Sequence, residues 1–490
     1  MFCIDLRSLA ACRIAIGLIL IYDLVLRSCD LKAHYTDAGV LPRSDLYHLY
    51  LSQRPYFSIH ALNGSAAFEA LLFWIAGICA LALIAGYRTR IATVGCWFLT
   101  CSLQARNPIV LHGGDDLLRM LLFWGMFVPM GGRWSIDRAR ASRVDVKDET
   151  VCTWGSAGLL LQVCFLYFFA GALKSHPSWR HDGTAVFLAL SIDQFTTPLG
   201  KALLPYHGLL IVMTFGTLLL ELVGPFVAMF CFDISRIRTF IVASYIVFHI
   251  GLGLCIELGI FPAVCIAGWL AFLPGVFWDN VQRHFGPRLA GLLAWLPSSL
   301  VKFGQARLAA VRARPLRLKL SRAGSIAAGI CLIYITLWNI RTVNYARFSY
   351  IFPARLDFIG EILRIDQQWN LFAPYPSLEH GWYVLDAHLV DGKEVDIRTG
   401  KAVNWDRPSL VSVTYVNERW RKYLMNLWTG QYAAYRPGYS RYLRRTWDEA
   451  HPASQRLATL EIYFVLQTAL PNYQVSPAQH VRIWTEEFSR

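Results

Sequence analysis

The chain has 490 residues, of which 55% are hydrophobic and only 16% are charged, whereas soluble domains usually carry about a quarter charged residues. The formal net charge of +14 would suit a nucleic-acid-binding protein, but the basic residues cluster beside apolar runs, where they set orientation and contact anionic lipid. The composition therefore excludes an ordinary soluble domain, argues against nucleic-acid binding, and predicts a helical protein in contact with membrane lipid.

Nine apolar runs approach the length of about 20 residues that crosses a bilayer. The first has no small-residue cleavage site after it, so it is interpreted as a membrane helix and not as a signal peptide. The third and fourth runs are short and are expected to be extended, tilted or partly re-entrant. The runs cover residues 9–26, 66–85, 91–103, 117–130, 151–173, 209–232, 237–258, 260–277 and 323–340.

The distribution of Lys and Arg predicts the orientation. With a cytoplasmic N-terminus, the basic segments 88–90, 133–147, 236–238 and 283–322 all fall in cytoplasmic loops, as the positive-inside rule requires. An odd number of spans then places the C-terminus on the other side. We expect a multi-pass protein of the cell inner (plasma) membrane with an extracytoplasmic C-terminal domain.

Two features between the runs have alternative interpretations. The outer loop 34–43 is either a solvated loop with a glycine turn or part of a lid over an outward-facing pocket. The twelve cysteines lie almost all in or beside apolar runs without CxxC spacing, so they are interpreted as small apolar fillers. None follows Cys331, which excludes a disulfide scaffold or thiolate zinc site in the C-terminal part. No metal is predicted.

Residues 286–319 are basic, with leucines 289, 292, 293 and 296 at helical spacing, and are predicted to form an amphipathic interfacial helix. From residue 342 long apolar runs stop. Alternation over 381–389, the turn Asp391-Gly392 and the return 393–398 predict a hairpin; 457–466 reads as a strand and 419–428 as a helix. Segment 369–374 is expected to pack this part onto the bundle, and no catalytic constellation is evident in it.

The predicted fold is therefore an all-α polytopic membrane bundle of about nine transmembrane helices with a small C-terminal α+β extracytoplasmic domain. We divide the chain into a transmembrane domain (1–280), a basic interfacial segment with the last transmembrane helix (281–341), and the extracytoplasmic domain (342–490).

Ionisable residues at membrane depth cost about 2.5–3.5 kcal/mol each, so they usually face the interior and a partner. Structural pairing or a water-filled cavity would explain Arg13, Asp23 and Glu221. His249 would be a neutral histidine bonded across helices, and Glu257 would be exposed near the outer end. Asp115 and Asp116 stand just before the fourth run.

Lys174 ends the run 151–173, after Ala170 and Gly171 and before His176 and Trp179. A lysine at this place is either an interfacial anchor or a desolvated amine that can act as a base. The small residues one turn earlier would let another helix or a flat ligand approach. We take Lys174 as the candidate catalytic base. The candidate pocket residues are His249, His176, Trp179, Asp115, Asp116, Glu221 and Glu257. No HExxH, Walker or GxSxG motif accompanies them.

These residues carry a family resemblance. The run AG-x-x-K-x-x-x-x-W from Ala170 to Trp179 resembles the membrane domain of the vitamin K-dependent γ-carboxylase, as do segments 86–88, 134–137 and 219–222. Segments 34–43, 113–115 and 369–374 resemble the bacterial branch, the HTTM (horizontally transferred transmembrane) domain family. The similarity covers residues 5–280 well and extends loosely to 376.

The resemblance implies that Lys174 is the base that takes a proton from a reduced naphthoquinone of the vitamin K type. Oxygen and carbon dioxide would be co-substrates, and an exported peptide or protein would be modified in a γ-carboxylase/epoxidase-like (lyase) reaction. The chain departs from the family in two ways. Gly114-Asp115 stands about where the carboxylase has a second important histidine, with His112 two or three residues away, and the carboxylase's large C-terminal part is replaced by a shorter one.

Two functions follow. The protein is a membrane enzyme that uses Lys174 on a quinone or another lipid-soluble substrate at the outer membrane face, or it is a non-enzymatic maturation, immunity or assembly factor that binds an exported partner through its C-terminal domain. A transporter is less favoured, because the sequence shows no inverted repeat and no paired broken helices.

Overall fold

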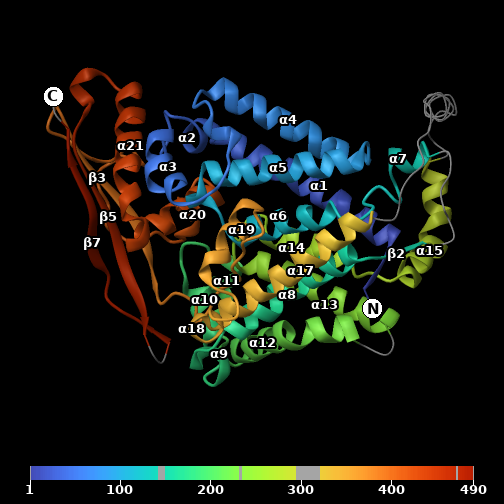
Figure 1. Ribbon diagram of the computed structural model, residues 1–490. Coiled ribbons are helices and arrows are strands. Elements are labelled where there is room, and N and C mark those ends of the chain that lie inside the picture. Colours follow the sequence, from blue (N-terminus) through green and yellow to red (C-terminus); the bar gives the residue numbers. More distant parts are fainter. Residues whose placement is uncertain (1, 142–148, 231–233, 294–320, 471–472, 489–490) are drawn as a thin grey trace.

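The computed structural model describes residues 2–141, 149–230, 234–293, 321–470 and 473–488, as a bundle of helices capped at one end by a β-sheet (Figure 1). The long helices are α1 (Leu6–Cys29), α4 (Ala66–Ala85), α5 (Thr89–Arg106), α6 (Gly113–Gly125), α8 (Trp154–Leu173), α12 (His207–Phe230), α13 (Ile234–Cys255), α14 (Phe261–Leu270), α15 (Gly275–Leu293) and α17 (Arg322–Val343). Short helices connect them: α2 (Leu31–Tyr35), α3 (Arg43–Leu49), α7 (Ile136–Ala139), α9 (Pro177–Arg180), α10 (Ala185–Ser191), α11 (Pro198–Leu203), α18 (Tyr345–Phe348) and α19 (Asp357–Ile362).

Within the described residues, six helices are long and apolar enough to cross a membrane, namely α1, α4, α8, α12, α13 and α17. A seventh is present if α14 and the first part of α15 form one span, but they are bent by 95°. The nine predicted spans are therefore not confirmed. Run 91–103 lies in α5, which includes Arg90 and Arg106, and run 117–130 begins inside the 13-residue α6, which carries Asp115 and Asp116.

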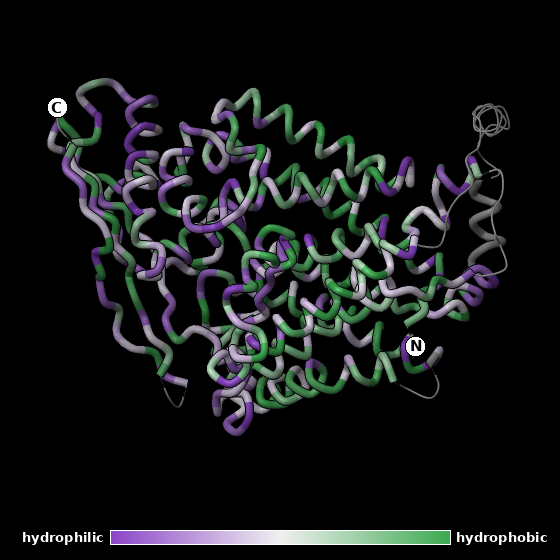
Figure 2. The backbone as a smooth tube through the Cα atoms, in the orientation of Figure 1, coloured by the Kyte–Doolittle hydropathy of each residue, from purple (hydrophilic) through white to green (hydrophobic). Residues whose placement is uncertain are grey.

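Apolar side chains cover the outside of these helices. Trp74 on α4 is 73% exposed, Phe240 and Val247 on α13 are each 69% exposed, and Val212 on α12 is 68% exposed. Figure 2 shows these helices as mainly hydrophobic along their length. Soluble monomers rarely expose contiguous apolar surface of this extent, so these faces are the ones that contact lipid.

Helix α8 lies at the centre of the bundle, and 72% of the residues in its most apolar stretch are buried. It packs against α6, α12 and α17. Close approach depends on small residues: a Cβ at Gly158 would lie 2.2 Å from Trp124 of α6. Helix α8 begins at Trp154, three residues after the start of the predicted span 151–173. Thr153 and Ser156 form the capping box that starts it.

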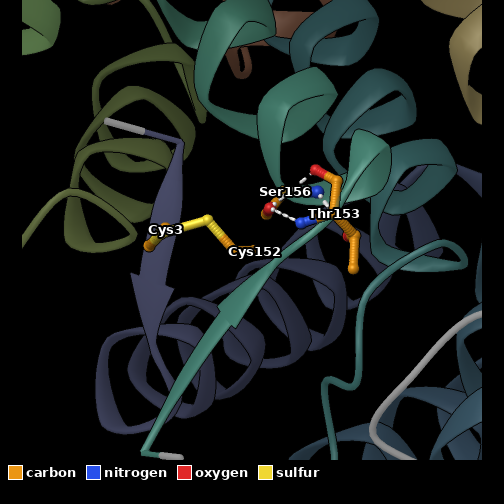
Figure 3. Close-up of a disulfide and its surroundings, with 4 residues drawn as sticks. All are labelled: Cys3, Cys152, Thr153 and Ser156. Atoms are coloured by element: carbon orange, nitrogen blue, oxygen red, sulfur yellow. Dashed lines mark hydrogen bonds between the residues drawn. A yellow bond between two sulfur atoms is a disulfide. The ribbon is translucent and has the colours of Figure 1, made fainter.

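Residues just before α8 are extended. Strand β2 (Thr150–Cys152) pairs antiparallel with β1 (Cys3–Asp5), and a disulfide joins Cys3 to Cys152 (Figure 3). The interpretation of the cysteines as fillers is wrong for these two, since 149 positions separate them and nothing local signals the pair. The other cysteines of the described residues are free.

The C-terminal region, residues 342–490, contains an antiparallel sheet with β4 (Glu394–Asp396), β3 (Glu379–Leu389) and β5 (Leu457–Leu470) adjacent in that order. Strands β6 (Gln474–Val475) and β7 (Gln479–Glu487) also pair with β5. The predicted hairpin is confirmed, with Gly392 at φ +86° in its turn. Helix α20 (Glu418–Trp428) matches the predicted helix, whereas α21 (Arg436–Ala450) and β7 were not anticipated.

The loop 34–43 joins the two parts of the molecule. His34, Val40 and Leu41 are each 1% exposed, and the last two belong to the same apolar core as residues of the sheet and α20. The predicted glycine turn is present, with the N–H of Gly39 donating to the carbonyl oxygen of Thr36 at 3.0 Å, but the loop is not solvated, because its apolar side chains are buried against the C-terminal region. Its role as part of a lid stays a prediction.

Segment 369–374 attaches the C-terminal region as predicted. Trp369 is completely buried in the core of the bundle, and the indole Nε1 of Trp179 donates to the carbonyl oxygen of Phe372 at 3.0 Å. The predicted amphipathic helix 286–319 falls almost wholly outside the described residues; only the backbone of α15 up to Leu293 is described there.

Candidate functional site

Lys174 caps the C-terminal end of α8, where its backbone leaves the helix, and its side chain turns back into the protein. It is 1% exposed. Its Nζ lies 3.0 Å from Oε1 and 2.7 Å from Oε2 of Glu221 on α12, and 4.9 Å from the ring centroid of Trp179. The interfacial-anchor interpretation is therefore excluded, because an anchoring lysine extends its ammonium to water.

Gly171 brings α12 close enough for this ion pair. A Cβ at Gly171 would lie 3.0 Å from Leu222 and 3.1 Å from the Cβ of Glu221, so a larger side chain would push α12 away. Pro225, one turn after Glu221, has no N–H to donate to the carbonyl of residue 221. The small residues before Lys174 thus admit another helix, one of the two roles predicted for them.

A second polar pair crosses from α8 to α13. The hydroxyl of Tyr167 lies 2.6 Å from Nε2 of His249, and the Nδ1 of that histidine is buried without a hydrogen-bond partner. The prediction of a histidine bonded across helices is confirmed. Tyr245 and Trp269 stack at 3.9 Å between ring centroids, and both rings also pack against the ring of Tyr167.

Lys174, Glu221 and His249 line one large cavity between the bundle and the C-terminal region, with a volume of about 1630 Å³. Trp179, Asp116 and Glu257 also line it. Its wall has an apolar part, formed by the bundle, and a polar part, to which α17, α19 and α20 contribute. The apolar part includes Leu166, Leu190, Phe195, Leu220, Phe248 and Phe261, and the polar part includes Arg54, Arg341, Glu361, Glu418, Arg421 and Lys422.

His176 and Asp115 are not part of this wall. His176 is exposed, caps α9 by accepting from the backbone N–H of Ser178 at 3.2 Å, and contacts Tyr375. Asp115 turns away from the cavity into a buried set of charges, which we name the charge cluster: Asp23, Arg27, Asp115 and Arg419.

The charge cluster is neutral overall. Arg27 lies 2.7 Å from Asp23 and 2.6 Å from Asp115, and Arg419 lies 2.7 Å from each of the same two aspartates. Two guanidinium groups thus compensate two carboxylates, and each carboxylate oxygen accepts a hydrogen bond from a guanidinium N–H. This explains the aspartate inside the first membrane run, and it fixes α20 of the C-terminal region to α1 and α6.

Other predicted polar residues also have structural partners. Arg13 donates to the carbonyl oxygens of Met130, Ile84 and Trp134. Asp116 pairs with Arg119 at 3.0 Å, and Glu257, whose side chain is 44% exposed, pairs with Arg421 at 2.5 Å.

The polar residues that α20 contributes were not predicted from the sequence, namely Glu418, Arg419, Arg421 and Lys422. They begin an amphipathic helix and resemble the charged face of any surface helix. The apolar residues Trp420, Tyr423, Leu424 and Leu427 on the same helix were the available signal that it is packed on two sides. Within the described residues, no group of three or more His, Cys, Asp or Glu side chains could hold a metal ion.

Helices with lipid-facing apolar surfaces around a large cavity that contains a buried Lys–Glu pair define an integral membrane protein. The family model for the HTTM domain matches residues 3–276, more than half of the chain, so the chain belongs to the HTTM domain family. Lys174, Glu221 and His249 all lie in the matched part. No curated protein and no solved structure matches the chain.

Proposed function

We propose that this protein is an integral membrane enzyme in which Lys174 acts as a base on a quinone or another lipid-soluble substrate, as in the vitamin K-dependent γ-carboxylase that the sequence resembles, and that it modifies an exported peptide. The observation that supports the proposal is the buried Lys174–Glu221 pair on the wall of the large cavity.

The Lys174–Glu221 pair provides the two groups that base catalysis requires, an amine and a carboxylate that can take its proton. An amine becomes a base only after it has lost its proton, and the carboxylate of Glu221 is in direct contact to accept that proton. Water has almost no access to the amine, because Lys174 is 1% exposed. A substrate hydroxyl in the cavity is then the group that competes for the lone pair of the neutral amine.

The cavity wall fits a reduced naphthoquinone. Phe195, Phe248 and Phe261 supply flat apolar surface for the rings, and Lys174 with Glu221 supplies a polar contact for a hydroxyl group. Gly216 of α12 and Gly251 of α13 are exposed and line the cavity, and apart from the adjacent backbone of their own helices no described atom lies within 4 Å of the position that a Cβ would occupy on either, so the cavity reaches the lipid-facing side of the bundle. When bound, the reduced quinone would supply the acidic hydroxyl, with oxygen and carbon dioxide as co-substrates.

The test uses detergent-purified full-length protein with reduced naphthoquinone and oxygen, and Lys174→Ala in parallel. We expect mass spectrometry to detect quinone epoxide with the native chain and none with the variant. Absence of epoxide from a folded native sample, across quinones with short and long side chains, would refute the proposal.

We further propose that the N-terminus is cytoplasmic and that the cavity opens on the outer face of the cell inner membrane. The N-terminus and the sheet lie at opposite ends of the bundle (Figure 1), and the basic loops favour a cytoplasmic N-terminal end. The Cys3–Cys152 disulfide at that end argues the other way, because disulfides persist mainly in oxidising compartments.

Cys29 discriminates between the two orientations. It is a free, exposed cysteine at the end of α1 nearest to α20, since the neighbouring Asp30 accepts from the indole N–H of Trp420 at 3.0 Å. A membrane-impermeant maleimide is expected to label Cys29 in intact cells, with Cys29→Ser as the control. Labelling that requires permeabilised cells would reverse the proposed orientation.

The alternative function is a non-enzymatic factor that binds an exported partner through the C-terminal region. Strand β7 favours it, because it pairs with β5 on one side and most of its residues are exposed or half-buried, as in sheets that accept an added strand. An intact physiological phenotype in Lys174→Ala would favour this alternative.

A further inference from the structure

The cavity has a second polar position besides the Lys174–Glu221 pair. That pair belongs to the bundle, whereas the second position comes from the C-terminal region. Glu418 is the first residue of α20 and lines the cavity. Its side chain is 9% exposed, and both carboxylate oxygens are buried without a hydrogen-bond partner; the nearest cation, Nε of Arg419, lies 3.5 Å from Oε1. A buried carboxylate without donors is strongly unfavourable, so this position suits a ligand that donates a hydrogen bond.

Ion pairs hold the start of α20, and with it Glu418, in place. The next residue, Arg419, is held by Asp23 and Asp115 at 2.7 Å each, and Arg421 is held by Glu257 at 2.5 Å. The space for the carboxylate is provided by Gly259, at φ +59°, because a Cβ there would lie 1.0 Å from Oε2 of Glu418. Glu418 is therefore kept at the cavity wall by the ion pairs of the residues that follow it.

The nearest group that completes the site is His112, the N-cap of α6. Its Nδ1 accepts from the backbone N–H of Gly114 at 3.1 Å. Burial lowers the pKa of His112 to about 3, so the imidazole is neutral at physiological pH. A neutral imidazole that accepts at Nδ1 carries its proton on Nε2. That Nε2 is buried and lacks a hydrogen-bond partner, 3.9 Å from Oε2 of Glu418 and 3.6 Å from Oδ2 of Asp115.

A donor and an acceptor thus face the same cavity at a separation too long for a direct hydrogen bond. A hydroxyl group can accept from the Nε2–H of His112 and donate to the carboxylate of Glu418 at the same time. A carboxylate ligand would be repelled by Glu418, and an ammonium would leave the Nε2–H of His112 without an acceptor. The pair therefore selects a hydroxyl-bearing ligand.

We propose that Glu418 and His112 form a hydroxyl-binding site that makes the C-terminal region part of the substrate cavity. This inference rests on the proposed function for the identity of the cavity, and it deepens it by assigning to the substrate a hydroxyl group that this site holds. No residue of α20 lies in the segment that the HTTM domain model matches, so the site distinguishes this chain from the matched domain alone.

The test is a binding measurement that does not depend on turnover. Isothermal titration calorimetry under argon compares 1,4-dihydroxynaphthalene with 1,4-dimethoxynaphthalene on detergent-purified full-length protein. We expect the native chain to prefer the dihydroxy compound, and Glu418→Gln to lower that preference about tenfold, the effect of removing a hydrogen bond to a charged group. His112→Asn is expected to act similarly while retaining an N-cap acceptor.

Glu361→Gln is the matched control, because Glu361 lines the same cavity but already pairs with Arg54 at 2.9 Å. It should keep the native preference. The same measurements in a Lys174→Met background separate the two proposals, since the effect of Glu418→Gln must persist there even if no epoxide is ever formed. An unchanged preference in folded Glu418→Gln and His112→Asn would overturn the hydroxyl-binding site.

Discussion

Replacing Lys174 by methionine is expected to abolish epoxide formation and to lower the free energy of unfolding by about 3–5 kcal/mol. The methionine leaves the carboxylate of Glu221 buried without its cation, and broken buried ion pairs are destabilising by this amount. Denaturant or thermal unfolding in detergent measures the stability, and the quinone assay measures the activity.

The double variant Lys174→Met/Glu221→Leu separates catalysis from stability. Replacement of both partners of a buried ion pair by apolar residues is often neutral or stabilising, so the double variant should recover most of the lost stability. It should remain without activity, because the base is absent. Epoxide formation by a folded double variant would remove Lys174 from the chemistry and leave it with a structural role.

Arg419→Met is also expected to lower the free energy of unfolding by about 3–5 kcal/mol. This loss arises where the C-terminal region contacts the bundle. The substitution removes one of the two cations of the charge cluster and leaves Asp23 and Asp115 with Arg27 alone. Because α20 is fixed to the bundle by this residue, limited proteolysis should release the C-terminal region at lower protease concentration than in the native chain.

Arg441→Ala is the matched control for this prediction. Arg441 of α21 also joins the C-terminal region to the helical part, through Asp45 of α3 at 2.5 Å, but the two side chains are 50% and 30% exposed. Exposed ion pairs contribute about 0–1 kcal/mol, so this variant should unfold and digest as the native chain does. Equal effects of Arg419→Met and Arg441→Ala would show that burial of the charge cluster contributes nothing.

The two arginines show why charge in the C-terminal region was misjudged from the sequence. Both stand in amphipathic helices beside aromatic residues, so the local sequence gives no reason to expect one to be buried and the other exposed. One is buried by residues from α1 and α6, which are 396 and 304 positions away, and the other faces solvent. Burial of a charge is decided by its partners, and these come from distant parts of the chain.

Local signals led to correct predictions where the physics is local. The alternation over 381–389 with Asp391-Gly392 predicted the hairpin, and the end of the apolar run predicted that Lys174 follows α8 directly. The run from Ala170 to Trp179, taken with segments 34–43, 113–115 and 369–374, led to the HTTM family, which the domain match shows. The count of nine spans is not confirmed: the run 260–277 lies on α14 and α15, which are bent by 95°, and the runs 91–103 and 117–130 fall on α5 and α6, which carry charged residues.

Composition, run length and short motifs were enough to indicate a helical membrane protein of the HTTM family with a lysine directly after the apolar run 151–173. These are properties of neighbouring residues, so they can be read without the fold. The three-dimensional arrangement was needed to learn that Lys174 meets Glu221, that Asp115 belongs to the charge cluster and not to the cavity, that Cys3 bonds to Cys152, and that Glu418 reaches the cavity wall. Each of these contacts joins residues far apart in the chain, so its energy depends on packing and burial that no local pattern contains.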